Sequence, residues 1–191
     1  LEIGCHDGSK SFALANFGAK QVIGSDISEY YINERVGETV NKKSSSKQNT
    51  FLELLREKIK KSGENNNLLH NSSKVSFIED DISQSKLQRG SFDIIFSFEV
   101  LEHLVNPESA FIQMARILKP GGYATHEYNP FFSLIGGHSL CTLDFLWGHA
   151  RLNQKDFLRY IQKMRPREVE ITKNFYEKCL NRMTLSDLKR Y

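Results

Sequence analysis

The chain has 191 residues, of which 39% are hydrophobic and 26% are charged, and its formal net charge is +3. This length suits one domain with a sizeable core, and no apolar run is long enough to span a bilayer. Because the basic residues are scattered among acids, the composition gives no case for nucleic-acid binding. Cys5, Cys141 and Cys179 have no paired metal-ligand spacing, which predicts free thiols in a reducing compartment and favours a cytoplasmic location.

The first residues, Leu1 to Gly8, are typical of a short apolar strand that turns through a glycine-containing loop into a helix, predicted here over Ser9 to Phe17. In open α/β folds such a loop lies at the carboxyl edge of a parallel sheet, where backbone N–H groups bind ligands. The chain begins without a methionine and inside this strand, so we expect an N-terminally truncated form of the fold, with residues missing upstream.

The loop does not match a dinucleotide site. That site requires Gly-x-Gly-x-x-Gly, whereas the pattern here is Gly4-x-His6-x-Gly8. Glu2 would repel a pyrophosphate but attract a ligand with an ammonium and a sulfonium, such as S-adenosylmethionine. The second apolar run ends at Asp26, at the spacing expected of an acid that binds ribose hydroxyls. Taken singly, Glu2 could be a strand-end charge and Asp26 a helix N-terminal acid.

Five ordered segments extend this pattern. On them the chain resembles the class I S-adenosylmethionine-dependent methyltransferases, in particular the small-molecule group related to ubiquinone and menaquinone methyltransferases. The resemblance implies a Rossmann-like fold and S-adenosyl-L-methionine as the cofactor. It runs from Leu1 to about Asn129, and the matching segments are Leu1 to Gly8, Val22 to Asp26, Val75 to Asp81, Phe92 to His103 and Arg116 to Gly122.

Strands that alternate with helical stretches predict an α/β fold with a doubly wound, mostly parallel sheet. We expect a methyltransferase core over residues 1–129, with a surface insertion at 41–73. A loop-rich and helical segment, 130–191, would follow in the same domain and cover the substrate. Asn106 is predicted to cap a helix whose first turn holds Pro107.

The resemblance also implies a cofactor site. The loop glycines would let backbone approach the methionyl and ribose groups, and the acids would hold the polar groups of the cofactor. Asp81 is assigned to the adenine amino group, with its neighbour Asp80 as the alternative. The implied cofactor-binding residues are Glu2, Gly4, Gly8, Asp26, Ile27, Asp81, Ile82 and Ser97.

His6 departs from the family, because most relatives have glycine at this position. Histidine tolerates a positive φ better than most residues, so we predict a permitted variant that points to solvent. The alternatives are weakened cofactor binding or a contact with the methionine carboxylate.

For a hydroxyl or acid-bearing acceptor, the protein must align the acceptor and remove a proton. His126, at the expected mouth of the fifth strand, and His138, in the segment that follows, are the predicted catalytic bases. His103 belongs to a motif shared by relatives with different acceptors, which favours a structural or pocket-wall role. His138, Asp144 and His149 could instead pair a base with its orienting partner or bind a metal, but without a tight histidine spacing we expect no metal.

The segment from Phe131 to His149 is rich in aromatic residues and has no clear period, which is typical of a cover over an acceptor pocket; a structural crossover is equally compatible. Beyond it we predict a helix over Gln154 to Met164, a break at Arg165 to Arg167, a strand over Glu168 to Lys173 and a helix-compatible tail. The arginines at the break could bind an acidic acceptor, although solvated side chains are the simpler interpretation.

The sequence therefore predicts a methyltransferase that transfers a methyl group to a small-molecule acceptor, with oxygen favoured over carbon or nitrogen. A methyltransferase-like binding module without turnover is the alternative. A nicotinamide-dependent oxidoreductase is disfavoured by the missing glycines. We expect no nucleic-acid partner and no membrane span, while the acceptor and the oligomeric state stay open.

Overall fold

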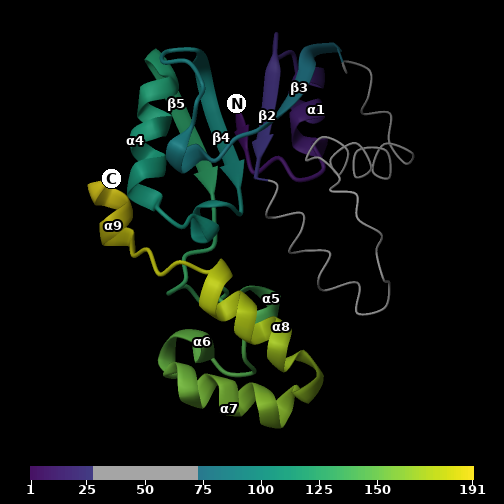
Figure 1. Cartoon of the computed structure of the whole chain (residues 1–191), viewed down its shortest axis with the longest axis vertical. Coiled ribbons are helices and arrows are strands. Elements are labelled where there is room, and N and C mark those ends of the chain that lie inside the picture. The colour runs from purple at the N-terminus through teal and green to yellow at the C-terminus, as the bar shows by residue number, and fades with distance from the viewer. Residues whose placement is uncertain (28–72) are drawn as a thin grey trace. The chain divides into compact units, whose positions relative to one another are not determined.

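The computed structural model describes residues 1–27 and 73–191 (Figure 1). The predicted insertion at 41–73 lies outside the described residues, except for its last position. Two compact units emerge: the first comprises Leu1–Ser97 and Gln113–Thr125, and the second comprises Phe98–Ile112 and His126–Tyr191. The predicted division after residue 129 stays a prediction. Within the described ranges, no helix combines the length and the hydropathy needed to cross a membrane.

A five-stranded sheet has the order β3-β2-β1-β4-β5 (Figure 1). β1 pairs in parallel with both β2 and β4, and β2 pairs in parallel with β3. The predicted doubly wound, mostly parallel sheet is therefore confirmed. The strand order reverses at β1, and open α/β sheets bind ligands at such a switch point. The strands are β1 (Glu2–Ile3), β2 (Val22–Asp26), β3 (Val75–Glu79), β4 (Phe92–Phe98) and β5 (Leu118–Glu127).

The first helix, α1 (Ser9–Asn16), follows the loop after β1 as predicted. Phe12 and Ala15 are buried, which gives the helix an apolar face. The helix was predicted to extend to Phe17, but it ends one residue earlier, and Phe17 is its C-cap and is 90% exposed. A 3₁₀ turn, η2 (Ile82–Gln84), follows β3.

A second 3₁₀ turn, η3 (Leu101–His103), follows β4 and precedes α4 (Pro107–Ile117). The Asn106 side chain accepts a hydrogen bond from the Ser109 N–H at 3.1 Å, which confirms the predicted cap. The last turn of α4 belongs to the first unit, where Arg116 donates to the carbonyl groups of Ser85 at 2.9 Å and Leu87 at 2.8 Å.

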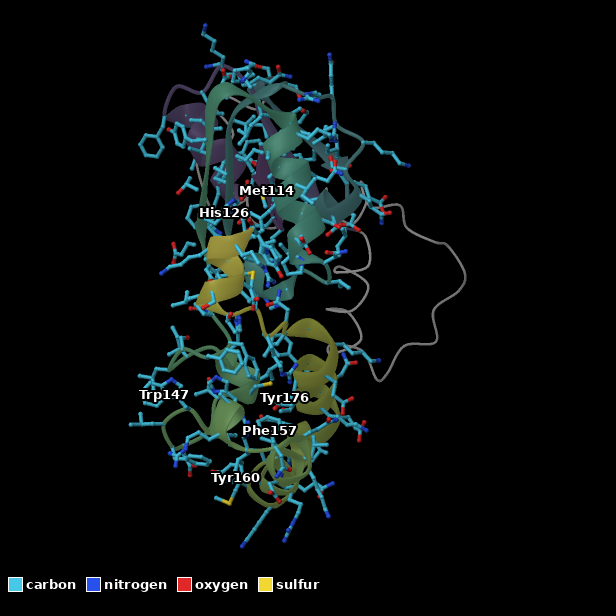
Figure 2. All side chains as sticks on the ribbon, turned by 90° about the vertical axis from the view of Figure 1, so that its left-hand side faces the viewer. Met114, His126, Trp147, Phe157, Tyr160 and Tyr176 are labelled. Atoms are coloured by element: carbon cyan, nitrogen blue, oxygen red, sulfur yellow. The ribbon has the colours of Figure 1, made fainter. Side chains whose placement is uncertain are left out.

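The second unit has its own hydrophobic core, in which the Phe157 and Tyr176 rings stack with their centroids 4.2 Å apart (Figure 2). Phe131 and Ile161 are also buried there. The predicted helix over Gln154 to Met164 is confirmed as α7, which Asn153 caps through the Asp156 N–H. The other helical elements of this part of the chain are α5 (His138–Cys141), α6 (Gly148–Arg151), η4 (Pro166–Glu168), α8 (Val169–Asn174) and the π-helix η5 (Phe175–Cys179).

The strand predicted over Glu168 to Lys173 is wrong, because this segment is helical in η4 and α8. The β-branched residues of the segment favour an extended chain locally. In the structure, Thr172 and Tyr176 lie four residues apart and are both buried, which is the spacing of a helix face. Packing of this face against the core therefore outweighs the local β propensity.

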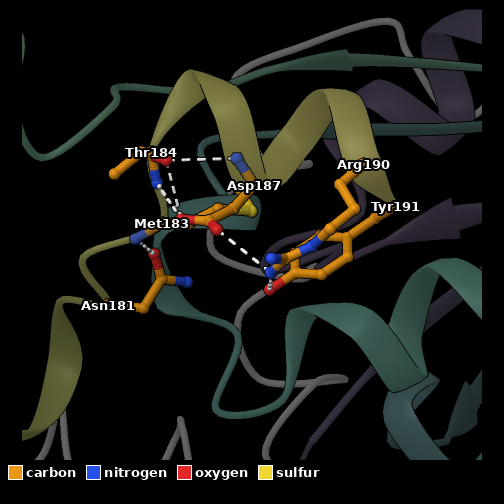
Figure 3. Close-up of polar contacts among 6 residues, drawn as sticks. All are labelled: Asn181, Met183, Thr184, Asp187, Arg190 and Tyr191. Atoms are coloured by element: carbon orange, nitrogen blue, oxygen red, sulfur yellow. Dashed lines mark hydrogen bonds and ion pairs between the residues drawn. The ribbon is translucent and has the colours of Figure 1, made fainter.

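The chain ends in α9 (Leu185–Arg190), which begins with a capping box (Figure 3). The Thr184 hydroxyl accepts from the Asp187 N–H at 3.1 Å, and the Asp187 carboxylate accepts from the Thr184 N–H at 3.0 Å. Arg190 donates to the same carboxylate at 3.1 Å. Here the predicted helix-compatible tail is confirmed.

Candidate cofactor and acceptor sites

The register of the sheet aligns the predicted cofactor residues of the first unit. Ile3 of β1 lies between Ser25 of β2 and Ser97 of β4. One position further along, Asp26 pairs with Glu79 of β3. The carboxyl ends of β1 to β4 are therefore at a similar level, and the loop after β1, the end of β2 and the turn after β3 lie along one edge.

The loop after β1 is tied to the end of β2 through the Asp26 carboxylate. One carboxylate oxygen accepts from the His6 N–H at 2.8 Å, and the other accepts from the Ile27 N–H at 2.9 Å. Asp26 is only 8% exposed. These two bonds fix the orientation of the carboxylate, and a carboxylate oxygen can accept more than one hydrogen bond. The contact with a ribose diol that the sequence predicts for Asp26 stays a prediction.

The loop turns through three left-handed positions: Gly4 at φ 68°, His6 at φ 47° and Gly8 at φ 72°. The positive φ anticipated at His6 is therefore present, and the side chain is exposed as predicted. Gly8 also lacks room for a side chain, because a Cβ atom there would lie 2.5 Å from the Phe77 ring. Glycine at this position thus allows both the turn and the close packing of the loop on β3.

Glu2 lies beneath the loop with an exposed fraction of 2%. Its carboxylate accepts a hydrogen bond from the Ser11 hydroxyl of α1. Burial raises the pKa of Glu2 to about 7, although the hydrogen bond from Ser11 opposes this effect. Glu2 therefore joins β1 to α1, which agrees with a role in supporting the loop.

The turn after β3 presents two acids with different surroundings. The Asp81 carboxylate accepts from the Ser83 N–H and from the Gln84 side chain, both at 2.9 Å, so it caps η2. Asp80 accepts from the Lys86 N–H at 3.1 Å through one oxygen, while the other is buried with no hydrogen-bond partner among the described residues. An unsatisfied buried oxygen is costly and marks a position where a donor fits.

Two apolar residues and a serine complete the predicted set. Ile27 is 41% exposed at the end of β2, where an aromatic base can pack on it. Ile82 is buried and belongs to the core beneath η2. Ser97 is buried at the end of β4. These positions are those the sequence predicted, and the assignment of each to a part of the cofactor stays a prediction.

The histidines predicted as bases lie in the second unit. His126, near the end of β5, is edge-on to Phe111 with ring centroids 6.2 Å apart, and burial lowers its pKa. His138 begins α5 at φ 51°, and its Nε2 atom lies 3.3 Å from the buried carboxylate of Glu102. The neutral ring that burial favours at His126 is the form that accepts a proton.

The predicted grouping of His138, Asp144 and His149 does not form. His149 is buried and its Nε2 contacts the Phe131 carbonyl oxygen at 2.7 Å, while Asp144 accepts from the Tyr160 hydroxyl. His138 instead groups with Glu102 and with His103, which the sequence analysis treated as structural. Sequence spacing could not reveal this cluster, because Glu102 and His103 belong to η3 whereas His138 belongs to α5.

The second unit also contains a cavity of about 550 Å³. Phe131, Phe132 and Tyr176 give it an aromatic wall, and Arg182 lies over the Phe131 and Tyr176 rings at 4.6 and 4.8 Å. An aromatic pocket was predicted for the segment from Phe131 to His149. Only Phe131 and Phe132 of that segment line the cavity, because residues between 150 and 154, η5 and Arg182 form the rest of the wall.

The three cysteines are free, as the sequence predicted. Cys5 and Cys141 are buried, and burial raises the pKa of the Cys141 thiol to about 12. Cys141 is therefore a protonated core residue and a poor nucleophile.

A sheet that reverses at β1, with a left-handed glycine loop and an acid at the end of β2, defines a Rossmann-like nucleotide-binding protein. A family model described as "Methyltransferase domain" matches residues 1–125, and the chain belongs to this family. The membership confirms the family predicted from the five motifs, and with it S-adenosylmethionine as the cofactor.

Curated relatives that match part of the chain are also methyltransferases. It is 25% identical to the sterol 24-C-methyltransferase of Aspergillus fumigatus over 129 residues, which is 67% of this chain and 27% of that protein. It is 35% identical over 60 residues to an uncharacterized methyltransferase of Mycolicibacterium gilvum, covering 31% of this chain and 24% of that protein. The chain thus spans about a quarter of the length of these relatives.

Among solved structures, the chain is similar to an S-adenosylmethionine-dependent methyltransferase of Mesorhizobium loti, with a TM-score of 0.47 and 17% identity over 70% of this chain and 47% of that one. It is also similar to a possible histamine N-methyltransferase of Thermotoga maritima. There the TM-score is 0.49 and the identity 19%, over 99% of this chain and 58% of that one.

The described residues fit the cofactor. Asp26 offers an oriented carboxylate to a diol, and Asp80 offers a buried oxygen that lacks a donor. Gly8 keeps the loop close to β3 where a side chain would not fit. The exposed Ile27 supplies an apolar surface for a base.

Proposed function

We propose that this protein transfers the methyl group of S-adenosylmethionine to a small-molecule acceptor. The observation that carries the proposal is the Asp26 carboxylate, held by the N–H groups of His6 and Ile27 at the switch point of the sheet. When bound there, the cofactor supplies a methyl group already activated by a positively charged sulfur. The protein therefore needs to align the acceptor and manage a proton.

Each predicted cofactor residue is assigned to one part of S-adenosylmethionine. Gly4 and Gly8 let the backbone approach the methionyl and ribose groups, and Glu2 holds the loop from beneath. Asp26 accepts from the ribose hydroxyls while Ile27 packs beside the adenine. Asp81 is assigned to the adenine amino group, and Asp80 is the alternative residue for this contact. Ile82 and Ser97 complete the cofactor pocket.

We assign proton removal to His126. Its ring is edge-on to Phe111, and its lowered pKa keeps it neutral at physiological pH. His138, the other predicted base, directs its Nε2 atom toward the Glu102 carboxylate. His126 is therefore the stronger of the two candidates.

Oxygen is the acceptor atom that we propose, and a base near the acceptor suits a hydroxyl group. Carbon is the second candidate, because the named relatives include sterol 24-C-methyltransferases. Their match covers 129 residues and only 27% of the relative's length, so it supports the carbon alternative weakly. A cytoplasmic enzyme without a nucleic-acid partner accords with the composition.

Two measurements test this function. Calorimetry should show binding of S-adenosylmethionine and S-adenosylhomocysteine but not of NAD. Incubation of metabolite extracts with methyl-labelled donor should give a labelled product, and hydriodic acid should release the label if the acceptor is oxygen. A label that resists this treatment would favour carbon. Binding without any labelled product would favour a binding module that lacks turnover, and selective NAD binding would contradict the proposal.

A further inference from the structure

A cluster in the second unit brings together one carboxylate and two imidazoles. Glu102 and His103 belong to η3, and His138 begins α5. One possible ligand atom from each side chain lies within 4.8 Å of the other two. The His103 and His138 ring centroids are 5.1 Å apart, and both rings pack against Phe175. The two histidine rings are therefore held in place by packing, and Phe175 covers one side of the cluster.

The carboxylate at its centre is oriented but incompletely satisfied. Glu102 is 1% exposed, and one of its oxygens accepts from the Asn129 N–H at 3.0 Å. Its other oxygen has no hydrogen-bond partner in the described ranges. Nε2 of His138 makes no hydrogen bond there either, although it lies 3.3 Å from the oxygen that Asn129 contacts. A buried polar atom without a hydrogen bond is costly, so the arrangement favours a ligand that contacts both atoms.

The hydrogen bond of His103 sets which of its ring nitrogens can ligate a metal. Its Nδ1 atom contacts the carbonyl oxygen of Cys179, which can only accept a hydrogen bond. Nδ1 therefore carries the proton and Nε2 carries the lone pair. Histidines that ligate metals usually donate their other ring N–H to a carbonyl or carboxylate in this way.

From these contacts we propose that Glu102, His103 and His138 bind a divalent transition-metal cation of the Zn²⁺ class. Metal–ligand distances of about 2.0–2.1 Å place tetrahedral ligand atoms about 3.4 Å apart. The 3.3 Å between His138 Nε2 and Glu102 already matches this separation. Two imidazoles with one carboxylate favour zinc, cobalt, manganese or iron over magnesium or calcium, which prefer oxygen ligands.

Three protein ligands leave a fourth tetrahedral position for water or for an oxygen of a bound molecule, as in zinc sites that act on substrates. A bound cation would occupy the Nε2 lone pair of His138, so this residue would serve as a ligand and not as a base. The structure assigns no such role to His149, whose Nε2 contacts the Phe131 carbonyl.

The test uses the whole chain after treatment with a chelator. Titration with Co²⁺ should give the visible absorption bands of a cobalt–imidazole site at one equivalent, and Zn²⁺ should displace them. Glu102→Gln and His138→Ala should each weaken Zn²⁺ binding by at least about 100-fold. His126→Gln also removes one imidazole but lies outside the cluster, so it should bind Zn²⁺ like the wild type.

Unchanged Zn²⁺ affinity in His138→Ala, or no cobalt bands in the wild type, would overturn the proposal. If Glu102→Gln fails to fold, His138→Ala and His103→Gln give the same test without loss of the buried carboxylate. Asp26→Ala should weaken S-adenosylmethionine binding by roughly ten-fold to a hundred-fold and keep Zn²⁺ binding. The metal site and the methyltransferase function can therefore fail independently.

Discussion

The backbone N–H of His6 donates to the Asp26 carboxylate at 2.8 Å and thereby joins the loop after β1 to the end of β2. The two parts of the chain that a nucleoside would contact are thus held by a single side chain. Because the Ile27 N–H donates to the same carboxylate at 2.9 Å, its orientation is set before any ligand arrives. Preorganisation of this kind reduces the entropic cost of binding.

Gly8→Ala should destabilise the protein more than a matched glycine substitution. The left-handed φ of 72° costs about 1–2 kcal/mol for alanine, and the collision of its Cβ with Phe77 adds about 1–3 kcal/mol. Gly90→Ala is the control, because its φ is 64° and nothing lies within 4 Å of the new Cβ. Urea unfolding measures both variants, and equal losses of stability would show that Phe77 does not restrict Gly8.

Glu2 should make stability depend on pH. Burial raises its pKa from 4.5 to about 7, so the folded chain favours the protonated carboxyl. The free energy of unfolding therefore includes a term from protonated Glu2. This stabilisation is fully present below pH 4.5 and is lost as the pH rises through about 7, and it totals on the order of 3 kcal/mol.

Denaturant unfolding between about pH 5 and about pH 8, which spans most of the range between the two pKa values, measures the loss. Glu2→Gln should remove this part of the pH dependence and be more stable than the wild type at the alkaline end. Ser11→Ala should shift the loss of stability to higher pH, since the hydrogen bond from Ser11 lowers the pKa of Glu2. A Glu2→Gln variant with the same pH profile as the wild type would show that Glu2 titrates normally.

His126→Gln should lower turnover while cofactor binding is retained. Loss of a general base costs roughly 100-fold to 10,000-fold in kcat. Because burial lowers the pKa of His126 from 6.5, wild-type turnover should be flat above neutrality and fall only at more acidic pH. Steady-state assays with labelled donor measure kcat, and calorimetry measures the cofactor Kd. Unchanged kcat in the variant would exclude His126 as the base.

The two acids after β3 can be separated by paired variants. Asp81→Ala should weaken S-adenosylmethionine binding by roughly ten-fold or more, the value of one charge-assisted hydrogen bond, if Asp81 holds the adenine amino group. Inosine-based analogues lack that amino group, so their affinity should be the same in Asp81→Ala and in the wild type. If Asp80→Ala shows this pattern instead, the buried oxygen of Asp80 is the adenine contact.

The sheet and the cofactor edge were predictable because their signals are local. Each apolar run that ends on an acid or a glycine marks a strand and its loop, and parallel pairing then brings Gly4, Asp26 and Asp81 to one edge. The left-handed φ at His6 was also anticipated, since a glycine-rich turn imposes the same backbone on whichever residue occupies it.

The C-terminal part was less predictable because tertiary packing decides it. A strand was predicted over Glu168 to Lys173, yet this segment is helical with Thr172 buried in the core. The approach of His138 to Glu102 depends on how α5 packs on η3, and no spacing in the sequence encodes that distance. The sequence also gives no sign that one Asp80 oxygen accepts from the Lys86 N–H while the other is buried without a hydrogen bond in the described ranges.

The most direct test is calorimetric titration of S-adenosylmethionine into the wild type, Asp26→Ala and Asp93→Ala. Asp93 is an exposed acid of β4 paired with Lys119 at 2.8 Å, and its loss should not alter binding. Loss of the Asp26 carboxylate should weaken binding by roughly ten-fold to a hundred-fold, equivalent to about 1.5–3 kcal/mol. Wild-type affinity in a folded Asp26→Ala variant would contradict the nucleoside site on which the proposed function depends.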